Sequence, residues 1–336
     1  MSARTVLVCG GAGYIGSHMC KRLAREGMLP VTFDNLSSGH RWAVRWGPLV
    51  VGDLLDASAL ARVLSEYRFA AVLHFAARIE VSESMREPLR YHRNNVLGTL
   101  NLLEAMRAAE VERLVFSSTA AVYGTPEYSP MDERHPTRPI NPYGRSKRLA
   151  EQMIEDACAQ PGLRAVALRY FNACGADADG ELGEAHDPET HLIPNVIRAA
   201  LDPAGASVKI FGDDYPTPDG TCVRDYTHVE DLVSAHLAAL RVLDAGPAFR
   251  AFNLGTGTGS SVAEVIEVCR RELGGRPAAE VVPRRQGDAP ELVASSALAS
   301  RELGWRPERT LTDCVRSAVA WHRKQLSGIG STSPRD

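Results

Sequence analysis

The chain has 336 residues, of which 44% are hydrophobic and 24% are charged, and its formal net charge is −3 at pH 7. A chain of this length can bury a large core, so we expect one large domain or two closely packed domains. The small net charge gives no reason to expect a nucleic acid or an anionic membrane as a partner. The seven cysteines form no C-x-x-C pair, and the chain leads straight into a predicted strand, so we expect a reduced, cytoplasmic protein without signal peptide or transmembrane segment.

Apolar runs alternate with amphipathic helical stretches through the first half of the chain. Six runs rich in β-branched residues predict strands at residues 5–9, 30–34, 49–52, 70–76, 113–119 and 165–171. Helical patterns between them cover residues 16–26, 57–66, 91–109 and 143–159. This alternation, with strands that are apolar almost throughout, predicts an α/β fold with a doubly wound, Rossmann-like parallel sheet covered by helices on both faces.

The second half of the chain differs from the first in composition. Residues 175–190 and 211–226 are rich in Gly, Asp and Pro and therefore predict loops. Helices are expected at 229–243, 262–273 and 311–325. We predict a dinucleotide-binding domain over residues 1–172, a smaller loop-rich α/β lobe that binds the substrate over 173–326, and a disordered tail over 327–336. A helix and a strand near 228–255 can return to the first domain.

A glycine-rich stretch, CGGAGYIGSH, follows the first predicted strand directly, and its glycines match both G-x-G-x-x-G and G-x-x-G-x-x-G. Such glycines permit a tight turn, a close approach of the backbone to a pyrophosphate, and close packing of the next helix, whose N-terminus attracts negative charge. A strand–helix turn without a ligand is the alternative. We expect a bound dinucleotide in contact with Gly10, Gly11, Gly13, Tyr14, Ile15 and Gly16.

Further cofactor contacts are expected where the next strands end. The second predicted strand ends in Asp34, whose carboxylate can bind a ribose 2′-hydroxyl and would repel a 2′-phosphate, which favours NAD over NADP. A carboxylate after the third strand can meet the adenine amino group, and small residues after the fourth leave room for the cofactor, although plain core packing explains these alanines equally well. These predicted cofactor contacts are Asp53, Leu54, Phe75, Ala76 and Ala77.

The stretch NPYGRSK sets Tyr143 and Lys147 four residues apart on one helix. Side chains at this spacing share a face, and a fixed positive charge favours ionisation of a nearby phenol. Ser117, Ser118 and Thr119 end the fifth predicted strand at the edge that carries the cofactor, where a hydroxyl could pass on a substrate proton. The alternative for the pair is a surface tyrosine beside a solvated lysine that has no function. The alternative for the three hydroxyls is capping of the strand end. Together, Thr119, Tyr143 and Lys147 predict hydride transfer, in which a phenolate removes the alcohol proton while NAD takes the hydride.

A series of motifs runs nearly from end to end of the chain: GGAGYIGSH, FDNLSSGHR, GDLLD, HFAA, NNVLGTLNLLEAM, FSSTAAVYG, NPYGRSK, RYFNACGA, IFGDDYPTPDGTCVRDYTHVEDL, NLGTGTGSSV and RRQGD. Together they resemble the extended short-chain dehydrogenase/reductase family, and most closely its UDP-glucose 4-epimerases. The resemblance implies an NAD that is held tightly and not consumed. It adds Asn35 and Asn94 to the cofactor shell, with Tyr143 and Lys147, and places Phe171 near the nicotinamide.

By the same resemblance the enzyme inverts C4 of a UDP-hexose, UDP-glucose or UDP-galactose, through a transient 4-keto sugar. Tyr143 takes the C4 hydroxyl proton, Thr119 helps to relay it, and Lys147 holds the nicotinamide ribose and lowers the phenol pKa. The family pairs two helices per subunit, here 91–109 and the helix that begins at residue 143, and this implies a homodimer. The first of these helices could equally pack inside its own chain.

The resemblance also implies a site for the UDP-sugar, made of Thr119, Tyr143, Asn172, His191, Leu192, Lys209, Phe211, Arg224, Arg285 and Asp288. Without the resemblance, Arg224 and Arg285 would read as solvated surface charges. Three positions depart from the pattern of some members. Ile79 replaces a cofactor-facing Lys, His191 replaces an Asn near the phosphates, and Leu292 replaces a Tyr that gates the sugar pocket. The preferred UDP-sugar therefore stays open, with UDP-N-acetylhexosamine or UDP-pentose as alternatives.

Other functions fit the residues less well. A nucleotide-sugar dehydratase needs carboxylates directly after the strand-end Thr, where this chain has Ala120 and Ala121. A dehydrogenase that releases NADH would give the two phosphate-clamping arginines no purpose, and a redox-sensing NAD-binding protein would have no need of Tyr143 and Lys147. The ten histidines show no H-E-x-x-H or comparable spacing, so we expect no metal.

Overall fold

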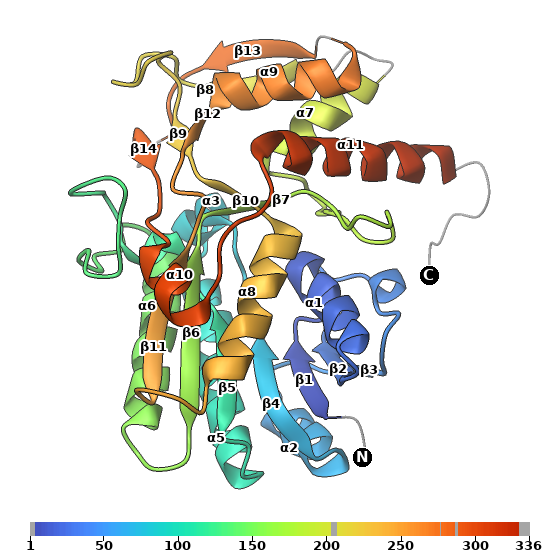
Figure 1. Ribbon diagram of the computed structural model, residues 1–336, viewed down its shortest axis with the longest axis vertical. Coiled ribbons are helices and arrows are strands. Elements are labelled where there is room, and N and C mark those ends of the chain that lie inside the picture. Colours follow the sequence, from blue (N-terminus) through green and yellow to red (C-terminus); the bar gives the residue numbers. More distant parts are fainter. Residues whose placement is uncertain (1–3, 203–206, 276, 286–287, 329–336) are drawn as a thin grey trace.

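The computed structural model describes residues 4–202, 207–275, 277–285 and 288–328 (Figure 1). A seven-stranded sheet forms its centre, in the order β11-β6-β5-β4-β1-β2-β3, and every pair of neighbours in it is parallel. The strands are β1 (Thr5–Cys9), β2 (Leu29–Asp34), β3 (Leu49–Val51), β4 (Phe69–His74), β5 (Arg113–Ser117), β6 (Arg164–Tyr170) and β11 (Phe249–Leu254). The predicted doubly wound parallel sheet is confirmed.

Alternate residues of β1 face opposite sides of this sheet, as successive side chains of a strand do. Val6 and Val8 join a core with α1 (Tyr14–Arg25), α8 (Val229–Val242) and α10 (Ala297–Leu303). Leu7 and Cys9 join a second core with three other helices, α2 (Ala57–Glu66), α5 (Gly98–Ala108) and α6 (Pro142–Cys158). Burial on both faces explains why the strands read as continuous apolar runs.

The predicted helix 91–109 is wrong in one respect, because it is not a single α-helix. It comprises α4 (Pro88–Tyr91), the π-helical segment η2 (His92–Leu97) and α5. Asn95 lies within the widened segment with only 2% of its surface exposed. Its side chain contacts both backbone groups of Arg78 and the Ser146 hydroxyl of α6. A π-helical turn adds one residue, which the 3.6-residue pattern of apolar side chains does not reveal.

The second lobe packs around its own core, formed by α7 (Leu192–Leu201), α9 (Val262–Leu273) and α11 (Leu311–Gly328). Its short strands are β7 (Asn172–Cys174), β8 (Ser207–Phe211), β9 (Val223–Arg224), β10 (Tyr226–His228), β12 (Ser260–Ser261), β13 (Ala278–Val282) and β14 (Glu291–Leu292). Three further short segments are η1 (Arg41–Ala43), α3 (Val81–Arg86) and η3 (Ala120–Val122). The first two residues of the predicted tail belong to α11, and the rest lie outside the described residues. The division at residue 172 stays a prediction.

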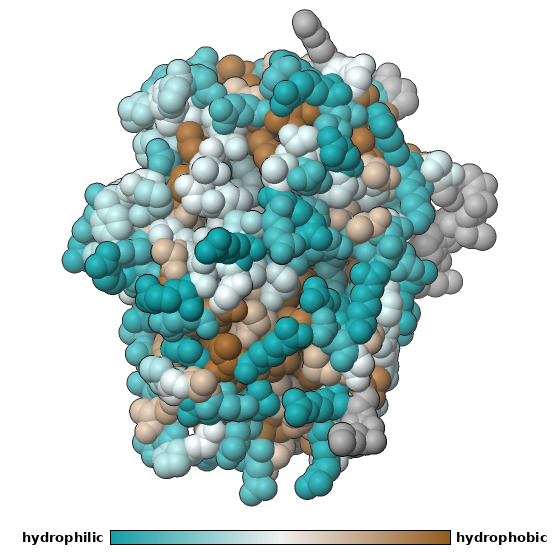
Figure 2. Space-filling view, viewed as in Figure 1, coloured by the Kyte–Doolittle hydropathy of each residue, from teal (hydrophilic) through white to brown (hydrophobic). Residues whose placement is uncertain are grey.

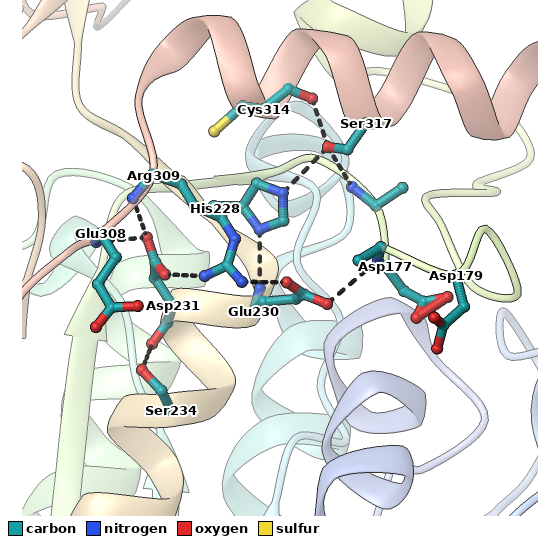
Figure 3. A network of polar contacts seen from close by, with 12 residues as sticks. Asp177, Asp179, His228, Glu230, Asp231, Ser234, Glu308, Arg309, Cys314 and Ser317 are labelled. Carbon is teal, nitrogen blue, oxygen red and sulfur yellow. Dashed lines mark hydrogen bonds and ion pairs between the residues drawn. The ribbon is translucent and has the colours of Figure 1, made fainter.

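Polar contacts fix the second lobe to the N-terminus of α8 (Figure 3). Asp231 accepts the backbone N–H groups of Glu308 and Arg309, each at 3.0 Å, and also pairs with the Arg309 guanidinium. Arg309 pairs with Glu230 as well, and the His228 Nε2 atom lies 3.1 Å from the Ser317 hydroxyl of α11. The segment that leads into α11 is therefore held against the helix that covers the sheet.

The face of the molecule in Figure 2 is mostly hydrophilic, with hydrophobic residues in small groups between the polar ones. Within the described part of the chain, every helix is too short or too polar to cross a lipid bilayer.

Candidate active site

The glycine-rich turn between β1 and α1 has no room for larger side chains. Gly10 has a φ of +80°, and a Cβ atom added there would lie 2.6 Å from the Ala76 nitrogen. A Cβ atom on Gly16 would lie 2.1 Å from the Gly10 oxygen, so this glycine lets α1 approach the turn. α1 begins at Tyr14 after Gly13 without a side-chain cap, which leaves its first N–H groups available to an anion. The turn has the shape of a pyrophosphate site.

Three predicted cofactor residues meet at the carboxyl ends of β2 and β3. Asp34 is buried, and its two oxygens accept the N–H groups of Ala12 at 3.0 Å and Leu36 at 2.8 Å. Burial raises the pKa of Asp34 above its ordinary value, and these two hydrogen bonds oppose the rise. The Asn35 side chain donates to Asp53 at 2.8 Å. The carboxylates therefore lie on the side of the glycine-rich turn where a ribose is expected.

The end of β4 borders the same turn. The N–H groups of Phe75 and Ala76 both donate to the Cys9 oxygen, and Ala76 lies against Gly10. The Phe75 ring packs on His236 with centroids 4.7 Å apart. The backbone of Phe75 and Ala76 therefore packs directly against the turn. Leu54 is buried in the core that includes α5, and the Asn94 side chain donates to the Asn95 side chain at 2.9 Å. The predicted contacts of Leu54, Ala77 and Asn94 with a cofactor stay predictions.

Tyr143 lies in the first turn of α6, whose N-cap Asn141 accepts the Gly144 N–H at 2.8 Å. Thr119 precedes η3, and its buried hydroxyl lies beside the Tyr143 phenol. Burial raises the pKa of Tyr143 to about 12, the Thr119 hydroxyl lowers it, and the charge of Glu80 raises it further. The predicted hydroxyl–phenol pair is thus assembled at the carboxyl edge of β5, with the phenol in its neutral form.

Lys147 follows one turn later on α6. The alternative of a solvated surface lysine is wrong. Its side chain is buried, its Nζ donates to the Ser117 backbone oxygen at 2.7 Å, and Nζ lies 4.6 Å from the centre of the Phe116 ring. Burial lowers the pKa of Lys147 to about 7, and the nearby Glu151 carboxylate opposes this shift. The Lys147 amine is therefore held in place at the end of β5.

Sequence patterns did not single out the buried ion pair behind this site. Glu151 has no exposed surface and accepts hydrogen bonds from Arg169 Nε at 2.8 Å and Nη2 at 2.7 Å. The Ser118 hydroxyl donates to the same carboxylate at 2.6 Å. Glu151 lies four residues after Lys147, on the same face of α6. This spacing could have predicted from the sequence that Glu151 lies near the site. The pair connects α6 to β6 and to the end of β5.

The second lobe brings predicted substrate-binding residues together in pairs. Arg224 Nη2 lies 3.4 Å from Asp288 Oδ1, and the Arg285 guanidinium lies over the Phe211 ring at 3.8 Å from its centre. The Arg224 side chain is only 13% exposed and also donates to the Ala289 oxygen at 2.8 Å, so it is not a solvated surface charge. Arg285 is exposed, as the alternative of a surface charge predicts. Lys209 lies exposed on β8, two residues before Phe211.

The region between the two lobes holds three more of the singled-out residues. The Asn172 side chain, at the start of β7, donates to the Asp225 oxygen at 3.1 Å. Phe171 and Leu292 pack against one small buried cluster, formed by Val122, Tyr123 and Met131. The residue expected near the nicotinamide and the residue expected at the sugar gate therefore contact the same apolar group.

His191 caps α7, and Leu192 is the first residue of that helix. The His191 Nδ1 atom lies 2.8 Å from a Glu184 oxygen and 3.3 Å from a Glu189 oxygen. Burial lowers the pKa of His191, but the two carboxylates raise it more, so that the result lies well above the ordinary value. Contact of His191 and Leu192 with substrate phosphates stays a prediction.

Comparison with known proteins agrees with this geometry. Residues 6–255 match the NAD dependent epimerase/dehydratase family. A UDP-glucose 4-epimerase of Rhizobium leguminosarum bv. trifolii is 52% identical over 96% of this chain and 99% of that protein. The human UDP-glucose 4-epimerase is 44% identical over 98% of this chain and 99% of its own length.

Solved structures give the same result. The UDP-glucose 4-epimerase of Brucella ovis in complex with NAD has a TM-score of 0.91 and 49% sequence identity, and the match covers 95% of this chain and 98% of that one. The enzyme of Bifidobacterium longum in complex with NAD+ and UDP has a TM-score of 0.91 and 38% identity, over 96% of this chain and 99% of that one. The chain belongs to the NAD dependent epimerase/dehydratase family, among its UDP-glucose 4-epimerases.

Proposed function

We propose that this enzyme interconverts UDP-glucose and UDP-galactose by inverting C4 of the sugar, with bound NAD that is regenerated in each turnover. The observation that carries this proposal is the Thr119–Tyr143 pair at the carboxyl edge of β5, on the sheet edge that also carries the glycine-rich turn. This arrangement supports the proposal, because oxidation of a sugar hydroxyl requires a base for the alcohol next to a bound dinucleotide.

The residues of the turn fit NAD. The glycines leave space for a pyrophosphate only because they lack side chains, and the buried Asp34 supplies a carboxylate for a ribose hydroxyl. A 2′-phosphate would meet this carboxylate as a like charge, which disfavours NADP. When bound, NAD accepts the hydride from C4 and gives it back.

Tyr143 takes the proton of the C4 hydroxyl. It returns the proton after the 4-keto sugar has rotated and presents its opposite face to the cofactor. Thr119 relays this proton, since its hydroxyl lies beside the phenol. Lys147 holds the nicotinamide ribose and favours phenolate over phenol when it is charged. Ala120 and Ala121 follow Thr119 in η3 and cannot transfer protons, so the chain lacks the acid at this place that a dehydratase would use.

Inversion requires that the enzyme bind the nucleotide tightly and leave the sugar free to rotate. Arg224 and Arg285 are suited to bind the diphosphate through charge-assisted hydrogen bonds. Asp288, which lies beside Arg224, would bind the uridine ribose, while Asn172, His191, Leu192, Lys209 and Phe211 complete the nucleotide site. Leu292 presents an apolar side chain at the sugar pocket, so that the sugar is not held by hydrogen bonds there.

The test is conversion of UDP-galactose by the purified enzyme in deuterated buffer, without added cofactor. We expect UDP-glucose to form with no deuterium at C4, because the hydride that leaves C4 is the one that returns. NMR of the product measures both. Solvent deuterium at C4, or no conversion without added cofactor, would contradict the proposal. UDP-N-acetylglucosamine and UDP-pentoses, run in parallel, identify the preferred sugar.

The proposal includes a homodimer formed by η2, α5 and α6. Leu97, Leu100 and Leu149 on these segments are exposed by 41%, 39% and 42%, and exposed apolar side chains on these helices support a subunit contact there. We expect light scattering to give about twice the 36.4 kDa mass of the chain. Leu149→Glu should shift this mass toward the monomer, and a wild-type monomer would contradict the dimer.

A cytoplasmic location is also proposed, since all seven cysteines are free and buried.

A further inference from the structure

The loop that leads into α7 gathers four ionisable side chains that the proposed proton transfer does not use. They follow the spacing E-x-H-x-x-E-x-H: Glu184, His186, Glu189 and His191. The carboxylates are deeply buried, with side chains that are 5% and 1% exposed. One ligand atom of each residue lies within 4.8 Å of the ligand atoms of the other three.

Four distances between ligand atoms of this cluster lie near the edge length of a zinc tetrahedron. His186 Nδ1 lies 3.2 Å from Glu184 Oε1 and 3.9 Å from Glu189 Oε1, and His191 Nδ1 lies 2.8 Å and 3.3 Å from the same two oxygens. A tetrahedral zinc ion with bonds of about 2.0–2.2 Å separates its ligand atoms by about 3.3–3.6 Å. An ion at the centre would thus need only small shifts of these side chains.

Three buried polar atoms of this cluster lack hydrogen bonds. His186 Nδ1, His191 Nδ1 and Glu189 Oε2 are buried and have no hydrogen-bond partner among the described residues. The two nitrogens lie near carboxylate oxygens but are not aligned with them as donors. A ring nitrogen directs its lone pair where its N–H would point, and in a metal site this direction leads to the ion. Glu189 Oε1 is in turn oriented by the N–H groups of Thr190 and His191, each at 2.9 Å.

Outside the cluster itself, the described residues offer little positive charge to the two carboxylates. Apart from the two histidines, Arg198 is the one cation of the described residues within 4.0 Å of these carboxylates, and it is half exposed. A second acidic cluster in the same loop differs in this respect. Lys21 reaches into the group formed by Asp177, Asp179 and Glu181, and pairs with all three. That cluster is paired with a lysine, which cannot bind a metal, whereas the Glu184–His191 cluster is paired with its own histidines, whose ring nitrogens can bind an ion.

We propose that Glu184, His186, Glu189 and His191 bind one divalent transition-metal ion, with zinc as the preferred ion. Imidazole nitrogens and carboxylate oxygens in a tetrahedron are zinc ligands, and four protein ligands make a closed, structural site. This departs from the expectation of no metal, which rested on a search for H-E-x-x-H spacing. Of the four ligands, only His191 is also proposed for the nucleotide site.

The position of the site indicates what the ion does. His40 Nε2 lies 2.6 Å from the Ala185 backbone oxygen, and the His186 ring packs edge-on against Tyr14 of the glycine-rich turn at 6.3 Å. His191 directly precedes the first residue of α7. The ion fixes the loop of the second lobe between the start of α7 and the dinucleotide-binding turn.

The test measures metal content of the full-length enzyme with its cofactor. We expect about one zinc per chain after chelator treatment, addition of an equivalent of zinc, and desalting. His186→Ala and Glu189→Gln should each bind zinc at least tenfold more weakly. Asp179→Asn, in the cluster paired with Lys21, is the matched control and should keep the zinc.

Two further measurements keep the test decisive if a variant folds poorly. Cobalt added to the wild-type enzyme should give the visible absorption of a tetrahedral ion, and zinc should raise the unfolding temperature of wild type but not of His186→Ala. A wild-type enzyme that binds less than about 0.1 zinc per chain, or an unchanged zinc affinity in His186→Ala, would reduce the cluster to an ion pair and overturn the proposal.

Discussion

Replacement of Tyr143 by phenylalanine is expected to lower epimerase turnover by about 10²–10⁴-fold, because it removes the only group proposed to take the C4 hydroxyl proton. The ring remains and the hydroxyl is lost, so α6 and the contact of Tyr143 with the Tyr91 ring should persist. Bound NAD should be retained, since its pyrophosphate is held at the glycine-rich turn. Turnover of UDP-galactose and cofactor content of the same sample measure the two effects.

The pH dependence separates loss of the base from a general loss of structure. Burial raises the pKa of Tyr143 to about 12, with the Thr119 hydroxyl lowering it and Glu80 raising it. Below the phenol pKa the active phenolate grows about tenfold per pH unit, so a rate limited by proton transfer should rise with pH. The positive nicotinamide lowers the pKa and moves the plateau to lower pH. Tyr143→Phe should lack this rise, while Tyr128→Phe, an exposed tyrosine, should keep it. A fully active Tyr143→Phe enzyme would remove the assignment.

The second large effect concerns stability. Glu151→Ala should lower the free energy of unfolding by about 3–5 kcal/mol, because it leaves the buried Arg169 guanidinium without its partner. Arg169 is 5% exposed, and its remaining contact is the Tyr123 hydroxyl at 3.0 Å, which cannot balance a full charge. Denaturant unfolding of the cofactor-loaded enzyme measures the change.

Two comparisons give this prediction its specificity. Glu155→Ala, on the exposed side of α6 one turn later, should change the free energy of unfolding by less than about 0.5 kcal/mol. Replacing both Glu151 and Arg169 by methionine should cost less than Glu151→Ala alone, because no buried charge is then unpaired. If the single and double variants were equally unstable, packing rather than charge would explain the loss.

Most of the fold could be predicted from the sequence because both faces of the sheet are buried. Each strand therefore reads as an apolar run, and the loops between strand and helix carry distinct turn residues. Residues at the carboxyl ends of these strands, such as Asp34 and Thr119, could be placed at the site for the same reason. β4 and β5 nonetheless end two residues earlier than predicted, where the chain bends toward the site.

Other features depend on contacts between distant segments and could not be predicted. The π-helical segment is tied to Asn95, which contacts α6 across 51 residues of chain. The charge state of Lys147 follows from burial, which spacing alone does not report. The Glu184–His191 cluster could have been found, since its four residues lie within one octapeptide, but a search limited to helical zinc motifs passes over it.

The return of β11 to the central sheet has a consequence for how the enzyme is built and degraded. The chain leaves the sheet after β6, builds part of the second lobe, and then comes back with α8 and β11 before it finishes that lobe. A fragment that stops at residue 172 would leave β6 as an open edge and would uncover the apolar groove along α1 that α8 fills. Neither lobe is a continuous piece of polypeptide, so the two lobes should unfold as one cooperative unit. During synthesis, the ribosome must pass residue 254 before β11 can complete the sheet.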